Sequence, residues 1–290
     1  MKTISTVLIV KNEEAMLARC LESVKDSDEI IVVDTGSIDN TVEIAKKYTD
    51  KVYTDFTWCD DFAKARNHAK SKATGDYILS IDADEYCHDF SKVREAVEMD
   101  IDAINVRMNM ENTTPPSFFY YSRLFKNKPE IFWCGAVHNV LNITGQRDSE
   151  VEITYGYSPA HELDPDRALR ILEKEVARLG DTAPREMYYL GREYWYKQDY
   201  KKCTETLGRY VQIAHWDAEK ADAFLIMSRA YSTQGLDEDA RDACLQAIKI
   251  NPHFKEALLF MAAIVPDEHA SQWKVMGETA NNTNILFQRV

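Results

Sequence analysis

Residues 3–14, TISTVLIVKNEE, set the pattern that decides the fold, because a run of apolar and β-branched residues ends in a polar cluster. The run has the length and composition of a buried strand, and an amphipathic stretch over residues 13–24 follows it. The alternation recurs, with strands expected at residues 29–33, 51–53 and 77–81 and helices at residues 39–48 and 61–72. This order predicts an α/β domain in which helices cover a parallel sheet.

Two further regions follow along the chain. From about residue 102 the sequence is β-rich, and we expect antiparallel strands that extend the sheet within the segments AINVRMNM, SFFYYSRLF, EIFWCGAVHNVL and EVEITYGY. Beyond Asp164 the sequence is helical and repeats itself, since Gly191 aligns with Ser228 and Ser228 with Ala262 at offsets of 37 and 34 residues. Small residues at this period, with Pro252 closing a unit, predict an all-α domain of tetratricopeptide-like repeats, and the alternative is an unrelated helical bundle. We therefore expect domains at residues 1–160 and 161–290.

The composition excludes several classes of protein. Hydrophobic residues make up 45% of the 290 residues and charged residues 29%, which is the balance of a globular protein. The six cysteines form no C-x-x-C pair, so neither a disulfide framework nor a cysteine zinc site is indicated. A net charge of −13 disfavours a broad surface for duplex nucleic acid. No apolar run approaches the ~18 residues of a membrane span, and the first residues lead directly into a strand, so we expect a cytoplasmic protein.

A D-x-D sequence carries the clearest chemical signal. Asp82 and Asp84 directly follow the strand expected at residues 77–81, and their i, i+2 spacing directs both carboxylates to the same side. Two hard oxygen ligands at a strand end can hold Mg²⁺ or Mn²⁺ against a diphosphate, and the ion would neutralise charge on a departing phosphate oxygen. The alternative for so short a motif is a solvated turn that caps the next helix.

Other polar residues lie at neighbouring strand ends, where ligands bind in open α/β sheets. Asp34 ends the second strand and could accept hydrogen bonds from a uracil or ribose, although it could instead cap the turn through residues 35–37. Arg66 lies on the helix at residues 61–72 and suits a nucleotide base or phosphate. A salt bridge from Arg66 to Asp60 or Asp61 is the alternative.

Several longer strings together resemble the family 2 glycosyltransferases of the GT-A fold. They are VLIVKNEEAMLARCLESVKDSDEIIVVDTGSIDNTVEIAKKY (residues 7–48), WCDDFAKARNHA (58–69), ATGDYILSIDADE (73–85), YSRLFKN (121–127) and GAVHNVL (135–141). The resemblance is closest to a branch in which tetratricopeptide repeats follow the catalytic domain, and YYLGREYWYKQDYKKC (188–203) resembles the first repeat of that branch. It extends over about 250 residues.

The resemblance implies roles for six side chains. Val10 and Glu13 would help to seat the nucleotide, Asp34 would bind its base or ribose, and Arg66 would support the same pocket. Asp82 would contact the ribose or the metal, and Asp84 would be the metal ligand proper.

The sequence departs from the family pattern at two places. The family has Val-His-Glu where Asn139 follows His138 here, so an acidic residue that could act as general base is missing. Relatives also carry a histidine where Thr154 stands, and His161 either supplies the third metal contact instead or the pocket lacks one. An inverting transfer needs a base, and the sequence leaves His138, Glu111 and Glu162 as candidates.

The implied function is transfer of a sugar from a nucleotide-diphosphate sugar, in the first place a UDP-sugar, with Mn²⁺ or Mg²⁺ and inversion. A repeat scaffold with an inactive nucleotide-binding domain is the alternative. A nucleotidyltransferase is disfavoured because residues 11–14 contain no glycine. Repeats bind peptides or other proteins, so a protein or peptide acceptor and self-association through the repeats are expected. Glycans, lipid-linked glycans and modified nucleic-acid bases are further acceptor classes, and the aromatic cluster at residues 118–121 and 133 fits either a sugar face or the core.

Overall fold

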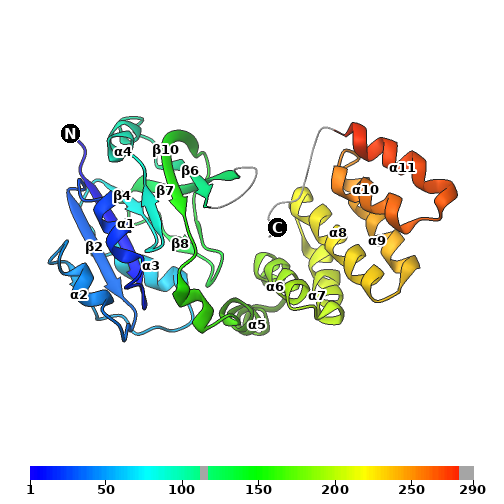
Figure 1. Cartoon of the computed structure of the whole chain (residues 1–290), viewed down its shortest axis with the longest axis horizontal. Coiled ribbons are helices and arrows are strands. Elements are labelled where there is room, and N and C mark those ends of the chain that lie inside the picture. Colours follow the sequence, from blue (N-terminus) through cyan, green and yellow to red (C-terminus); the bar gives the residue numbers. More distant parts are fainter. Residues whose placement is uncertain (112–116, 281–290) are drawn as a thin grey trace. The chain divides into compact units, whose positions relative to one another are not determined.

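The computed structural model describes residues 1–111 and 117–280, and the side chains of His161 and Leu163 lie outside this description. The chain divides into two compact units, Met1–Pro165 and Asp166–Val290 (Figure 1). The sequence expectation placed the boundary between residues 160 and 161. Residues 159–163 form a short 3-10 helix, Pro159–Leu163, at the end of the first unit.

An eight-stranded mixed sheet forms the centre of the first unit. Its strands are β1 (Ile4–Val10), β2 (Glu29–Asp34), β3 (Val52–Tyr53), β4 (Tyr77–Ser80), β5 (Glu85–Cys87), β6 (Ala103–Met110), β7 (Phe118–Lys126) and β10 (Arg147–Tyr155). The strand order is β3-β2-β1-β4-β7-β6-β10-β5. β1 lies parallel to β2 and β4, and β7 lies antiparallel to β4 and β6. The predicted parallel half of the sheet, and its extension by later strands, are confirmed.

Two details of the extension differ from the expectation. β10 pairs in parallel with β6, because the chain leaves β7 and crosses over to the far side of β6 before it forms β10. Most of the segment at residues 130–141 is not a strand of this sheet. It contributes only β8 (Trp133–Cys134) and β9 (Val140–Leu141), which pair with each other on either side of Gly135 with φ of 87°.

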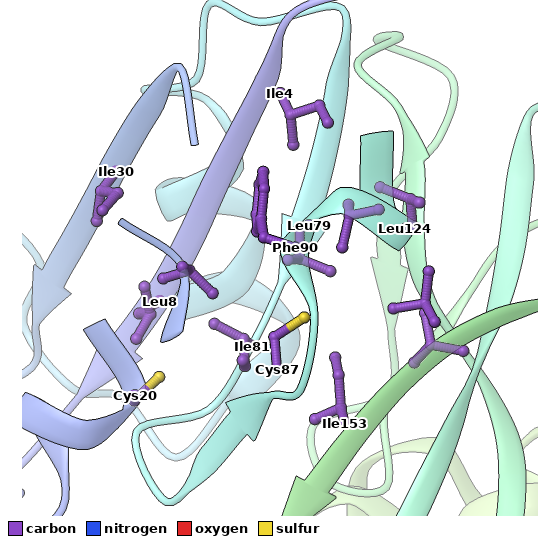
Figure 2. Packing of buried hydrophobic residues seen from close by; sticks show 14 of the residues in the cluster. Ile4, Leu8, Cys20, Ile30, Leu79, Ile81, Cys87, Phe90, Leu124 and Ile153 are labelled. Carbon is purple, nitrogen blue, oxygen red and sulfur yellow. The ribbon is translucent and has the colours of Figure 1, made fainter. Parts of the chain in front are cut away.

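Helices cover both faces of the parallel half. α1 (Leu17–Ser23), α2 (Thr41–Ala45) and α4 (Phe90–Val97) pack on one face, and α3 (Phe62–Lys70) packs on the other. Figure 2 shows the larger cluster, in which Leu8 of β1 lies with Cys20 of α1 and Phe90 of α4. Val7 of β1 belongs to the opposite cluster. Because β1 is covered on both sides, it reads as a continuous apolar run rather than an alternating one.

The second unit consists of helices that pack as successive pairs. They are α5 (Arg167–Leu179), α6 (Pro184–Tyr196), α7 (Tyr200–Ile213), α8 (Asp217–Thr233), α9 (Asp237–Ile250), α10 (Lys255–Ile264) and α11 (Asp267–Thr279), with a 3-10 turn at Gly180–Thr182. Gly191 of α6 faces Leu207 of α7 so closely that a Cβ at residue 191 would lie 2.4 Å from the leucine side chain. Ser228 of α8 is fully buried and donates a hydrogen bond to the carbonyl of Ala240 in α9. The predicted fold class, a GT-A-type mixed α/β domain followed by helical repeats with small residues at the crossings, is confirmed. Among the described residues, no helix combines the length and the apolar character needed to cross a membrane.

Candidate active site

The carboxyl ends of β2, β1 and β4 bring the acidic residues of the sequence prediction to one edge of the sheet. Asp34 is the last residue of β2 and pairs in register with Val10, the last residue of β1. Glu13 follows β1 in the turn that leads to α1, and its carbonyl accepts a hydrogen bond from the Leu17 N–H at 2.9 Å. Asp82 follows β4, which is the neighbour of β1 on the side away from β2.

Two arginines hold the Asp82 carboxylate. The Arg66 guanidinium lies 2.7 Å from Asp82 Oδ1, and Arg123 of β7 lies 2.9 Å from Oδ2. Burial alone would raise the pKa of Asp82, but Arg66 and Arg123 hold it well below its usual range. Arg66 therefore reaches across to the D-x-D sequence, and its ion pair with Asp60 or Asp61, the alternative expected from the sequence, is not formed. Asp61 instead caps α3 by accepting the Lys64 N–H.

Arg123 also contacts a second acidic residue, Glu85, at 2.5 Å. Both side chains are buried, with 8% and 4% of their surfaces exposed. The pKa of Glu85 is raised to about 7, because burial and the negative charge of Asp82 together outweigh the lowering effect of Arg123. The other Glu85 oxygen accepts the backbone N–H of Asp82 at 2.8 Å. Glu85 and Arg123 thus fix both the backbone and the side chain of Asp82.

Glu13 is a buried carboxyl at the same edge. Ser158, which follows β10, donates a hydrogen bond to Glu13 Oε2 at 2.6 Å. Burial raises the pKa of Glu13 to about 7, against the lowering effect of the Ser158 bond, and the charges of Asp84 and Asp82 add to the rise. This mutual effect means that Glu13 and the two D-x-D carboxylates share one electrostatic environment.

Asp34 caps the turn that follows β2. Its carboxylate accepts the N–H groups of Gly36 at 3.0 Å and Ser37 at 3.1 Å. Gly36 has φ of 109°, a value that favours glycine. The neighbouring loops are also joined, since Asn12 accepts the N–H of Ile38 at 2.8 Å. The turn-capping role of Asp34 is therefore present, and it orders the loop in which any nucleotide contact of Asp34 would be made.

Asp84 and Glu111 lie next to each other around Gly156. The Gly156 N–H donates to the Asp84 carbonyl at 3.1 Å. A Cβ on Gly156 would lie 2.7 Å from Glu111 Oε2, at the end of a flexible side chain, and 3.4 Å from the Asp84 carbonyl oxygen. Arg19 of α1 spans the same place, 3.4 Å from Glu111 Oε1. Glu111 follows β6 directly, and β6 is parallel to β4 through β7.

The remaining candidates lie elsewhere. His138 has φ of 51° in the loop between β8 and β9, and its Nε2 atom is buried. The next residue, Asn139, accepts a hydrogen bond from Arg66 Nε at 3.3 Å, so an amide in place of the family's acid contacts the arginine. Thr154 bonds to His88 at 2.7 Å. His161 lies in the 3-10 helix, with its side chain outside the described part of the chain, and Glu162 in the same helix is exposed.

Protein ligands for a metal ion are few at this edge. Within residues 1–111 and 117–280, no group of three His, Cys, Asp or Glu side chains is arranged to hold a metal ion. Asp82 already contacts two guanidinium groups. A divalent cation that takes most of its ligands from a bound diphosphate needs only one or two carboxylates from the protein, so Asp84 and its surroundings fit such an ion.

Comparison with known proteins agrees with the chemistry of this edge. Residues 5–128 match the model described as glycosyl transferase family 2. This part of the chain is similar to the family 2 glycosyltransferases. The match includes β1 except for Ile4, the strands β2 to β7 and the helices α1 to α4.

Several known proteins are similar to parts of the chain. A tetratricopeptide-repeat-containing protein of Synechococcus elongatus is 40% identical over 49% of the chain and 36% of its own length. The glycosyltransferase SunS of Bacillus subtilis is 31% identical over 66% of the chain and 49% of its own length. The chain thus spans half or less of these relatives. The structure of S. aureus TarS with UDP-GlcNAc is similar over 87% of the chain and 93% of TarS, with 14% identity and a TM-score of 0.47.

Arg123, Glu85 and Ser158 at the candidate site were not predicted from the sequence. Arg123 offered a signal, because it is a charged residue inside the strand-like segment YSRLF, and such residues are buried only with a partner. Glu85 adjoins the D-x-D sequence and was not distinguished from a solvated neighbour. Ser158 gave no signal, because it is 145 residues from Glu13 along the chain.

Proposed function

We propose that the chain transfers a sugar from a nucleotide-diphosphate sugar, in the first place a UDP-sugar, to an acceptor with inversion at the anomeric carbon. The proposal rests on one observation. Within the part of the chain that is similar to the family 2 glycosyltransferases, acidic residues from three adjacent strand ends, Asp34, Glu13 and the D-x-D pair, gather at the edge of the sheet where ligands bind in α/β folds. A nucleotidyltransferase, which needs a Gly-rich phosphate loop after the first strand, is disfavoured because residues 11–14 contain no glycine.

The donor roles follow from where each group lies. Val10 and Asp34 end paired strands, so the backbone of β1 and the carboxylate of β2 would border the nucleoside. Arg66 is held by Asp82, Ser80 and Asn139, and its remaining guanidinium face lies against the Trp133 ring at 5.3 Å. An arginine fixed in this way is suited to a phosphate or base without further ordering. Glu13, near Asp84, would seat the nucleotide from the β1 side.

Asp84 would hold Mn²⁺ or Mg²⁺ together with oxygens of the donor diphosphate. The bound ion would stabilise the charge that develops on the leaving diphosphate. Asp82 is better suited to a positioning role, because its two oxygens contact Arg66 and Arg123. The chain's own residues thus orient the donor and hold its phosphates.

Glu111 is the base candidate that the geometry favours. It lies beside Asp84 across Gly156, and about a third of its side chain is exposed. In an inverting transfer, the acceptor hydroxyl would attack the anomeric carbon as the bond to the diphosphate oxygen breaks, and Glu111 would take the hydroxyl proton. The buried Nε2 of His138 is less accessible to an acceptor.

Isothermal titration with UDP, with and without Mn²⁺, tests the proposal, together with release of UDP from a panel of UDP-sugars. We expect UDP to bind more tightly when Mn²⁺ is present and at least one donor to be hydrolysed slowly without acceptor. Absence of both metal-dependent UDP binding and donor turnover would contradict the proposal. It would favour the alternative, a repeat scaffold with an inactive nucleotide-binding domain.

A further inference from the structure

The open face of β7, β6 and β10 carries a patch of aromatic and polar side chains. Cross-strand pairing sets Phe118 opposite Asn109 and Tyr120 opposite Arg107, and sets Arg107 opposite Glu152 on β10. Directly opposite residues lie on the same face of a sheet. We call this set the open-face patch, and it consists of Phe118, Tyr120, Arg107, Asn109 and Glu152. The three strands are neighbours in the sheet (Figure 1).

This face is distinct from the core. The alternate residues of the same strands, such as Val106, Met108 and Ile153, are buried in the cluster below α1 and α4. Phe118 and Tyr120 are 49% and 42% exposed. Of the aromatic cluster in the sequence, Trp133 is buried in the core, whereas these two rings face solvent.

The side chains of the open-face patch are ordered by one another. The Arg107 guanidinium lies 4.1 Å from the centroid of the Phe118 ring. Arg107 donates to one oxygen of Glu152 at 3.2 Å, and the Asn109 amide donates to the other at 3.0 Å. The rings of Phe118 and Tyr120 are 6.1 Å apart and perpendicular. A surface held in this way loses little conformational entropy when a ligand binds.

The open-face patch borders the catalytic edge. Phe118 is the first residue of β7, which runs antiparallel to β4 and extends beyond the carboxyl end of β4. Asn109 is two residues before Glu111, the base candidate, and β6 ends at Met110 between them. A ligand that covers Phe118 and Asn109 therefore lies within a few residues of the place where the acceptor hydroxyl must lose its proton.

The chemical groups of the open-face patch determine which class of ligand it can bind. A sugar presents C–H groups that pack on exposed aromatic rings, and hydroxyls that bond to carboxylate, amide and guanidinium groups. A peptide that adds a strand needs a sheet edge, whereas β6 and β7 are interior strands. Nucleic acid is disfavoured, because Arg107 is the only cation of the patch and already bonds to Glu152. We propose that the open-face patch binds a saccharide, and that the acceptor of the proposed transferase is a glycan; this assignment rests on the proposed function.

The test compares the double variant Phe118→Ala/Tyr120→Ala with Phe132→Ala, an equally exposed aromatic outside the patch. Each protein is applied to an array of immobilised oligosaccharides and to an array of peptides, and release of UDP from the preferred UDP-sugar is measured without acceptor. We expect the wild-type protein to bind one or more oligosaccharides and the double variant to bind them at least about tenfold more weakly. Phe132→Ala should bind like wild type, and donor hydrolysis should be unchanged in all three.

Three results would overturn the inference: no oligosaccharide bound by wild type, equal binding by the double variant, or binding to peptides alone. Glu152→Gln gives a second variant, since it keeps the shape of the side chain but weakens its bonds to Arg107 and to sugar hydroxyls, and it should also reduce oligosaccharide binding. If no donor is hydrolysed although oligosaccharides bind through the patch, the proposed transfer fails while the saccharide site stands. If donors are hydrolysed and the patch variants bind normally, only the inference fails.

Discussion

Arg123 has its guanidinium between Asp82 and Glu85 in a place that solvent scarcely reaches. A buried charge that loses its partner is costly, so removing the arginine should leave Glu85 protonated and Asp82 with Arg66 alone. We predict that Arg123→Met destabilises the first unit by about 3 kcal/mol. Urea denaturation measures the free energy of unfolding. Hydrogen exchange of the backbone amides of β4 and β7 shows whether the loss of stability lies in the first unit.

Arg94→Met is the matched control for Arg123→Met. Arg94 pairs with Asp28 at 2.8 Å, but both side chains are about a third exposed. Such a pair contributes about 0–1 kcal/mol. Equal losses in the two variants would show that the buried network stabilises the fold no more than a surface ion pair does.

Glu13 gives a prediction about pH. Its pKa in the folded protein is about 7, above the ordinary value of 4.5, so the folded state binds more protons than the unfolded state between these values. Stability should therefore fall as the pH rises from about 4.5 to about 7, and the loss should be complete above pH 7. Glu13→Gln cannot ionise and keeps an acceptor for Ser158. We predict that it matches wild type near pH 4.5 and is more stable by on the order of 2 kcal/mol at pH 8.

Urea unfolding of wild type and Glu13→Gln at the two pH values measures this difference. Glu85 titrates in the same range but is present in both proteins, so the difference between them isolates Glu13. If the free energies of unfolding of wild type and Glu13→Gln changed with pH in the same way, the raised pKa of Glu13 would be contradicted.

At the scale of elements, the crossing of α6 and α7 depends on Gly191. A methyl group there would meet Leu207 at 2.4 Å, whereas a methyl group at Gly208 of α7 would meet only Met227, at 3.9 Å. Both glycines are inside helices, where alanine is favoured by roughly 1 kcal/mol. We predict that Gly191→Ala destabilises the second unit by about 1–3 kcal/mol through overpacking, while Gly208→Ala is neutral or stabilising. Thermal unfolding, monitored by the circular dichroism signal of the helices, measures the stability of both variants. If Gly191→Ala were more stable than wild type, the crossing of α6 and α7 would have room for a methyl group.

The elements that the sequence predicted best are those whose pattern is local. β1, β2 and β4 are buried on both faces and read as apolar runs, and Gly191 and Ser228 mark the helix crossings by their small size. The direction of β10 could not be predicted, because it depends on a crossover rather than on residues 147–155 themselves. Residues 130–141 read as a strand from their apolar content, but Gly135 and His138, both with positive φ, break the segment.

In the candidate site too, features set by the local sequence could be predicted, whereas contacts between distant segments could not. Strand ends identified Asp34, Glu13 and Asp82, because parallel strands present their carboxyl ends at one edge. The contact between Arg66 and Asp82 could not be predicted, since Asp82 is 16 residues away and only the packing of α3 on the sheet brings them together. Arg123 lies in β7 and Ser158 follows β10, both distant in sequence from their partners, so only the assembled sheet reveals these contacts.

For the whole molecule, the proposed donor residues and base lie in the first unit, Met1–Pro165. Among the acidic residues there, Asp82 contacts Arg66 and Arg123, and Glu111 contacts Arg19. We propose that the chain is a metal-dependent glycosyltransferase in which Asp84 holds the ion.

The most direct test is turnover of a UDP-sugar by Asp84→Asn over a Mn²⁺ titration. The amide keeps the volume of the side chain but removes its charge, so the fold should survive and the diphosphate charge should go uncompensated. Since a metal stabilises a leaving group by several kcal/mol, we predict a loss of about 10³-fold in turnover, with wild-type turnover abolished by chelator and Asp50→Asn, an exposed control, unaffected. Wild-type turnover by Asp84→Asn, insensitive to chelator, would contradict the metal-dependent mechanism.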